Sequence, residues 1–224
     1  MHHSKQMPPR RSGWIVAALA ALLARGAAAV TVSIIDETGT PVSAMAVVLT
    51  ALAGDPAPPV VGTPPYVVDQ VGLAFSPKVL VIPAGAQVRF PNSDTVSHHV
   101  YSFSRPNNFE LPLYKGTQPA PIRFDSPGLV TMGCNIHDHM LGYVIVVASP
   151  HVATTNIDGI AVIDNVPAGE YQLSIVHTET RDPNLQVVDT FILDGSAETV
   201  VYRLSDGATT PNDDSAGSLS WDEY

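Results

Sequence analysis

Short apolar segments separated by turn residues run through most of the chain. Residues 30–34 alternate apolar and polar side chains, as in a strand with one buried face. The turn sequence Asp36-Glu37-Thr38-Gly39 follows, and the apolar stretch 42–52 comes after it, so the pattern predicts a hairpin. Residues 53–65 are rich in proline and glycine, which indicates a linker or a domain boundary.

The block 66–148 shows the same alternation of strands and turns. We expect strands at 67–68, 73–75, 79–82, 87–90, 96–103, 122–124, 129–132 and 143–147. Residues 106–121 contain four prolines and few periodic positions, so we expect an irregular segment there. No stretch of the block combines helical length with a helical period. The pattern therefore predicts an all-β sandwich or barrel.

The block 151–204 contains further short strands, which we expect at 160–163, 171–175, 191–193 and 199–204. The tail 205–224 has five acidic residues, no basic residue and little apolar content. This composition predicts a disordered acidic tail that contributes to solubility.

The amino-terminal segment 1–29 has the pattern of an export signal. Basic residues (Lys5, Arg10, Arg11) precede an apolar run at 14–24, and small residues at 27–29 suit a signal peptidase. The apolar run is too short to span a bilayer. We expect cleavage near Ala29 and a periplasmic or otherwise exported protein with no stable membrane span after cleavage. An uncleaved amino-terminal anchor is the alternative.

The charge balance is strongly acidic once the leader is removed. The leader contains four of the 11 basic residues and none of the 21 acidic ones, which leaves a net charge of about −14. Such a surface repels phosphate backbones, so we expect no nucleic-acid partner.

The segment Gly133 to Met140 carries the chemistry. It contains the single cysteine of the chain, so Cys134 cannot form an internal disulfide. His137 and Met140 follow at intervals of three residues. A thiolate, an imidazole and a thioether form a soft-metal ligand set, and a copper electron-transfer site needs one thiolate, two imidazoles in a trigonal plane and a weak axial thioether.

The second imidazole must come from another strand, and the pair His98-His99 is the obvious donor. Alternation along the strand places His99, Tyr101 and Phe103 on one face and His98 on the other. Either face can be the inward one, so periodicity leaves both histidines as candidates.

Residues 66–148 resemble the cupredoxins, or blue type 1 copper proteins, especially the amicyanin and plastocyanin group. The resemblance rests on Cys-x-x-His-x-x-Met between two strands and on Phe90-Pro91-Asn92 followed by His98-His99-Val100. The same stretches resemble exported methylamine-utilisation-like proteins. The resemblance implies a cupredoxin-like Greek-key β sandwich with one type 1 copper ion, which passes single electrons to a redox protein partner. It implies the ligands His98, Cys134, His137 and Met140, and the alternation of side chains along the strand keeps His99 as the alternative to His98.

The remaining strands resemble a carboxypeptidase regulatory-like, transthyretin-type β sandwich. The segments 36–42 and 46–49 look like the start of that module, and Asp158-Gly159 and 166–171 look like its later part. We therefore hypothesise that residues 30–54 and 151–204 form this smaller sandwich, and that the copper domain 66–148 is inserted into one of its loops.

Other functions remain to be weighed against an electron carrier. A copper chaperone or storage protein would use the surplus histidines His99, His139 and His151. A copper oxidase or nitrite reductase would need them as a second, imidazole-only site. A cysteine hydrolase would leave Met140 without a role and would need an oxyanion hole, for which no pattern is visible. A structural zinc site would need four strong ligands. We therefore expect an electron carrier and not an enzyme.

Overall fold

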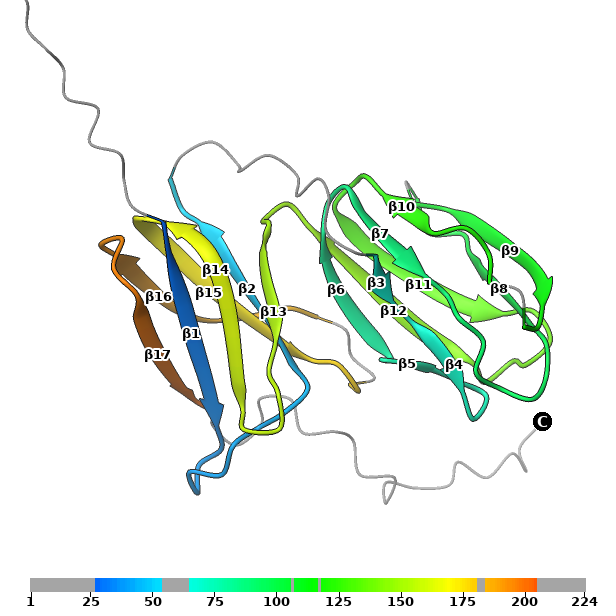
Figure 1. The fold of residues 1–224 in the computed structure, drawn as a ribbon, viewed down its shortest axis with the longest axis horizontal. Helices are drawn as coiled ribbons and strands as arrows, with labels where there is room; N and C mark the ends of the chain where they lie inside the picture. Colours follow the sequence, from blue (N-terminus) through cyan, green and yellow to red (C-terminus); the bar gives the residue numbers. More distant parts are fainter. Residues whose placement is uncertain (1–26, 54–64, 106, 117, 181–183, 205–224) are drawn as a thin grey trace, which may run out of the picture.

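The computed structural model describes residues 27–53, 65–105, 107–116, 118–180 and 184–204. Within these ranges the chain forms strands β1 to β17 and no helix, so the predicted all-β fold class is confirmed. The strands build two sandwiches that lie side by side (Figure 1). No helix in the described part is long and apolar enough to cross a membrane.

Three of the predicted segments lie wholly or mostly outside the described residues. They are the acidic tail 205–224, the linker 53–65 apart from its two end residues, and the export signal 1–29 apart from its last three residues. These three residues belong to β1 (Ala27–Ile35), which begins before the predicted cleavage point. Cleavage near Ala29 stays a prediction.

The smaller sandwich is built from both ends of the described chain. One sheet has the order β14-β1-β17 and the other β13-β2-β15-β16. Their bounds are β2 Met45–Ala51, β13 His151–Thr154, β14 Ile160–Pro167, β15 Gly169–His177, β16 Gln186–Leu193 and β17 Glu198–Arg203. The two sheets enclose a buried cluster that includes Ile34, Leu49 and Leu173. Within the described residues, β1 and β2 lie in different sheets and pair with strands after residue 150. The prediction that 30–34 and 42–52 form a hairpin is therefore wrong. The domain boundaries and the family of this sandwich stay predictions.

The larger sandwich contains the strands between residues 66 and 147. A five-stranded sheet has the order β6-β12-β11-β8-β9, a second sheet has the order β10-β7-β3, and β4 and β5 form a hairpin. The bounds are β3 Tyr66–Val67, β4 Asp69–Val71, β5 Ala74–Ser76, β6 Val79–Pro83, β7 Ala86–Arg89, β8 His98–Ser102, β9 Phe109–Tyr114, β10 Ile122–Phe124, β11 Gly128–Cys134 and β12 Leu141–Val147. Phe90, Phe124 and Met132 lie in its buried core.

The prediction of an irregular segment at 106–121 is wrong for its middle part. Residues 109–114 form β9, which pairs antiparallel with β8. Pro112 lies in this strand, and proline is tolerated there because β9 is the edge of its sheet, where one side of the backbone needs no partner. Strand β13, which pairs with β2, was not predicted either.

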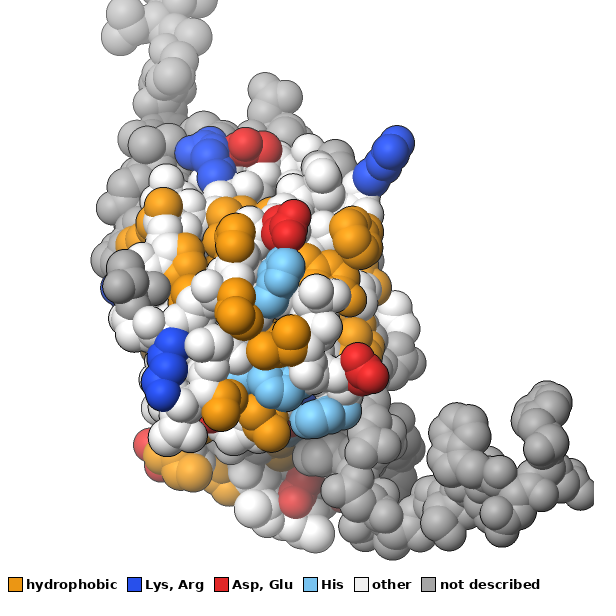
Figure 2. Space-filling model, turned by 90° about the vertical axis from the view of Figure 1, so that its right-hand side faces the viewer, with side chains coloured by type: hydrophobic (Ala, Val, Ile, Leu, Met, Phe, Trp, Pro, Cys, Tyr) orange, Lys and Arg blue, Asp and Glu red, His pale blue; other side chains and the backbone are white. Residues whose placement is uncertain are grey.

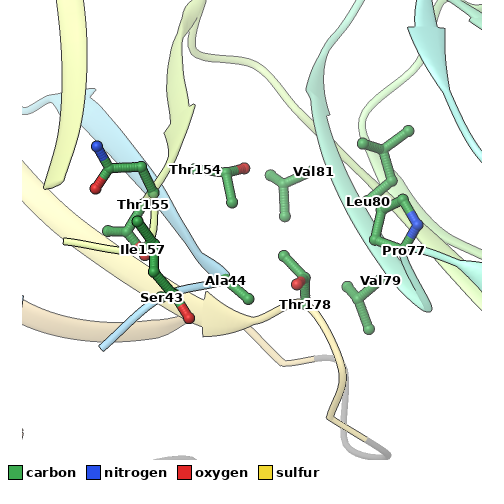
Figure 3. A pocket seen from close by; sticks show the side chains of 11 residues that line it. Ser43, Ala44, Pro77, Val79, Leu80, Val81, Thr154, Thr155, Ile157 and Thr178 are labelled. Carbon is green, nitrogen blue, oxygen red and sulfur yellow. The ribbon is translucent and has the colours of Figure 1, made fainter. Parts of the chain in front are cut away.

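The two sandwiches contact each other through apolar side chains. Val48 and Val176 of the smaller sandwich belong to one buried cluster with Val81 and Ile145 of the larger one. The backbone amide of Val79 also donates a 2.6 Å hydrogen bond to the carbonyl of Thr178. Side chains from both sandwiches line a cavity of about 310 Å³ at this contact (Figure 3). The larger sandwich is therefore supported by the smaller one along β6.

A glycine turn of the smaller sandwich offers a test of its packing. A Cβ at Gly159 would lie 2.5 Å from the backbone oxygen of Ile34, whereas a Cβ at Gly39 would meet nothing within 4 Å. Both glycines have positive φ, at 70° and 89°. We expect Gly39→Ala to lower the free energy of unfolding by about 1 kcal/mol through backbone strain. Gly159→Ala should lower the free energy of unfolding by about 1–3 kcal/mol more than Gly39→Ala does, because the backbone at Ile34 must move to make room for the Cβ. Urea unfolding measures both, and equal losses would contradict the observed packing.

A second test concerns pH. Burial lowers the pKa of His151, which packs edge-on against Tyr171. Below about pH 6.5 the unfolded chain takes up a proton at this residue, while the folded chain does so only at lower pH. The free energy of unfolding should therefore fall as pH decreases from 6.5. Chemical unfolding of the metal-free protein at several pH values measures this decrease. In His151→Gln the free energy of unfolding should decrease less steeply with falling pH than in the wild type. An unchanged slope would contradict the assignment.

Candidate metal centre

Two paired strands bring the first two donors together. β8 and β11 run antiparallel, with Cys134 opposite Val100. His98 lies two residues before Val100 and therefore projects from the same face of β8. That face is the inward one, since His98 is fully buried and Cys134 is 4% exposed. The alternative that the face of His99 points inward is wrong for this strand.

The loop after β11 supplies the third donor. The amide of Asn135 donates to the carbonyl of His99, which continues the pairing of β8 with β11 by one bond. The amide of Met140 then donates to the carbonyl of His137 at 2.9 Å and closes a turn. His137 is partly buried, and Met140 is buried in the same cluster as Cys134. Two of the predicted ligands, Cys134 and His137, thus meet His98 of β8 from one short segment, and Met140 is buried in the core cluster that contains Cys134.

The three donor atoms form a compact triangle. The Nδ1 atoms of His98 and His137 are 3.2 Å apart, and the Cys134 Sγ lies 3.7 Å from the first and 3.5 Å from the second. A point equidistant from the three atoms lies about 2.0 Å from each, which is close to metal–nitrogen bond lengths in proteins. Among the described residues, this is the one group of three such donors within 4.8 Å. It can hold one metal ion.

A carboxylate behind His98 orients its ring. The Nε2 atom of His98 lies 2.8 Å from Oδ2 of Asp94, and a carboxylate only accepts hydrogen bonds. Nε2 therefore carries a proton and donates it to Asp94, and Nδ1 is the ring nitrogen that faces Cys134.

Asp94 is itself held by a turn of the β4–β5 hairpin. The amides of Gly72 and Leu73 donate to its two oxygens, at 2.6 and 3.0 Å. Burial raises the pKa of the Asp94 carboxyl, but hydrogen bonds from these two amides and from His98 outweigh it and hold the pKa below its usual value. The carboxylate is therefore ionised at neutral pH.

Three further side chains support the segment that precedes His98. The buried amide of Gln70 donates to the carbonyl of Pro91 at 2.7 Å and to the hydroxyl of Tyr114. Asn92 donates to the carbonyls of Val96 and Tyr114, at 2.9 and 3.1 Å. These bonds tie the loop between β7 and β8 to β9. Sequence reasoning noticed Asn92 but gave no role to Gln70, Asp94 and Tyr114. Gln70 and Tyr114 find their partners at least 20 residues away, and Asp94 bonds to His98 four residues on and to the distant Gly72–Leu73 turn.

The other histidines lie apart from the triangle. His99 pairs through Nε2 with Glu110 at 2.8 Å on the outer side of the sheet. His139 is exposed, with its ring centroid 6.5 Å from that of His137. His151 lies in β13 of the smaller sandwich. The described residues therefore do not gather these three histidines into a second site.

No protein-family model and no curated protein matches the sequence. Among solved structures, the chain is similar to a copper-containing nitrite reductase from Thermus scotoductus SA-01, with 29% identity and a TM-score of 0.36 over 44% of this chain. It spans 25% of that enzyme. It is also similar to reduced amicyanin, with 22% identity and a TM-score of 0.35 over 44% of this chain and 98% of amicyanin. Because both TM-scores lie below 0.5, the conclusions about the site rest on its own geometry.

Substitution of the two adjacent histidines separates their roles. We expect His98→Ala to reduce the affinity for Cu(II) by more than the 10–100-fold that follows loss of a residue behind a ligand. His99→Ala should retain the affinity, because its ring faces Glu110. Competition titration with a chelator measures both affinities, and circular dichroism confirms folding. A loss confined to His99→Ala would contradict the observed register.

Proposed function

We propose that this chain is a type 1 copper protein that carries single electrons between redox partners. The observation that carries the proposal is the triangle of two imidazole nitrogens and one thiol sulfur. Two histidines and one cysteine in a trigonal arrangement, with a distant methionine, is the donor set of electron-transfer copper sites. His98, Cys134 and His137 would be the equatorial ligands and Met140 the axial one. A bound copper ion supplies the one-electron couple, Cu(II) to Cu(I).

The donor set favours copper over structural zinc. Structural zinc sites use four strong ligands in a tetrahedron, whereas this site offers three strong donors. The fourth predicted ligand is a thioether, which suits a soft ion. Met140 is 2% exposed and lies in the core cluster that also contains Cys134. The sulfur atoms of Cys134 and Met140 therefore both belong to buried side chains of one apolar cluster.

The scaffold favours rapid electron transfer because it resists movement. His98 begins β8, Cys134 ends β11, and Leu141 begins β12, so the loop that carries His137 is held at both ends by one sheet. A site whose ligands keep their positions in both oxidation states has little reorganisation to undergo when an electron arrives or leaves.

His137 offers the route to the surface, since it is the least buried of the three donors. Ile136 precedes it and Leu141 follows four residues later, and these side chains are 51% and 44% exposed. Figure 2 shows this side of the molecule, where histidine and hydrophobic side chains lie together and charged side chains are few. An apolar surface around the exit suits brief contact with a redox protein, because it excludes water without strong ion pairs.

Copper storage or delivery is less well supported. A protein that hands over copper must expose its thiolate to the recipient, and Cys134 is 4% exposed. An enzyme would need a second centre, for which His99, His139 and His151 lie too far apart within the described chain. Export to the periplasm, as the leader predicts, belongs to the same proposal, because a lone thiol in an oxidising compartment is protected when it binds a metal.

Loading the protein with Cu(II) tests the proposal. We expect one copper per chain and an intense visible thiolate-to-copper charge-transfer band, which Cys134→Ser removes. Voltammetry should then show a reversible one-electron couple. A colourless one-copper complex would contradict a type 1 site, and a coloured complex without a reversible couple would favour storage.

A further inference from the structure

We propose that Asp94 is a positioning residue that sets the reduction potential of the metal centre through His98. It fixes the ring so that Nδ1 faces Cys134, and it favours the oxidised state of the bound ion. This inference rests on the proposed copper function. It assigns a role to a residue that binds neither the metal nor a partner.

The hydrogen bonds around Asp94 form one connected path. The amides of Gly72 and Leu73 hold the carboxylate from one side, and His98 Nε2 donates to it from the other. Both turn residues have positive φ, at 62° and 61°. This conformation is uncommon for a leucine. It suits a two-residue hairpin turn, and in this chain the two turn amides meet at one acceptor.

The location of the pair makes its electrostatic effect strong. The His98 side chain is fully buried and that of Asp94 is 12% exposed, so solvent screens their interaction weakly. A carboxylate that accepts the Nε2 proton makes the other ring nitrogen a more basic ligand. A more basic ligand and a nearby negative charge both stabilise a doubly charged ion more than a singly charged one. The pair therefore lowers the reduction potential.

The chain contains two matched controls. Glu110 pairs with His99 at the same 2.8 Å distance, but its side chain is 65% exposed and its histidine lies outside the donor triangle. Asp69 of β4 accepts hydrogen bonds from the amide and hydroxyl of Ser93, the residue before Asp94. These bonds do not involve an imidazole. Glu110→Gln and Asp69→Asn thus remove one negative charge each and leave the bond to His98 intact.

The test compares Asp94→Asn with these two controls. We expect the affinity of Asp94→Asn for Cu(II) to fall by about 10–100-fold, the usual cost of losing a partner behind a ligand. The affinity for Cu(I) should fall less. The potential should rise by about 59 mV for each tenfold difference between the two losses, as for any one-electron couple. A potential that rises no more than in the two controls would overturn the proposal.

Asparagine offers one fewer acceptor to the Gly72–Leu73 turn, which can affect folding of the variant. A second measurement therefore uses the wild-type chain. Nitrogen-15 NMR of the metal-free wild-type chain reports the tautomer of His98. We expect a proton on Nε2, and a proton on Nδ1 would overturn the positioning role. The wild type separates failure of the copper function from failure of the positioning role. If the copper function is wrong, the copper-loaded wild type shows neither the visible band nor a reversible couple, whatever the tautomer of His98.

Discussion

The antiparallel pairing of β8 with β11 sets Cys134 opposite Val100 and Gly133 opposite Tyr101. Because strand side chains alternate between faces, this register also turns His98 inward. A slip of one residue would turn His99 inward and move His98 away from both Cys134 and Asp94. The buried apolar residues of β8 and β11 resist such a slip, since it would expose Val100 and Met132 to water. The hydrophobic core therefore selects which of the two histidines joins the donor triangle.

The smaller sandwich contributes to the stiffness of the site although it lies far from the donors. β12, which follows the ligand loop, pairs with β6, and β6 packs against the smaller sandwich through Val81. Gly142 in β12 lies so close to Phe75 that a Cβ there would be 2.8 Å from its ring. The strand after the loop is thus packed on both sides. The sheet holds the loop of His137 at its two ends, through β11 and β12. The close packing of β12 fixes one of these ends further and so limits the movement of His137.

Local sequence signals predicted the loop but not its surroundings. Cys134, His137 and Met140 lie within seven residues, so their spacing alone indicated a metal site. Periodicity left the choice between His98 and His99 open, because the inward face depends on pairing with distant strands. Asp94 lies four residues before His98, but the turn that holds it, Gly72 and Leu73, lies 22 and 21 residues earlier, so the sequence did not show that its carboxylate reaches the His98 ring. Strand β9 was missed because proline is read as a strand breaker, although an edge strand tolerates it.

The arrangement of the donors has an energetic consequence for the fold. Nδ1 of His98 lies 3.2 Å from Nδ1 of His137 and 3.7 Å from Sγ of Cys134. Because Nε2 of His98 donates a hydrogen bond to Asp94, Nδ1 is left to accept, and His137 and Cys134 are the groups that can donate to it. The same three atoms would bind a metal ion through their lone pairs. The binding free energy of that ion would add to the stability of the folded state and of this register in particular.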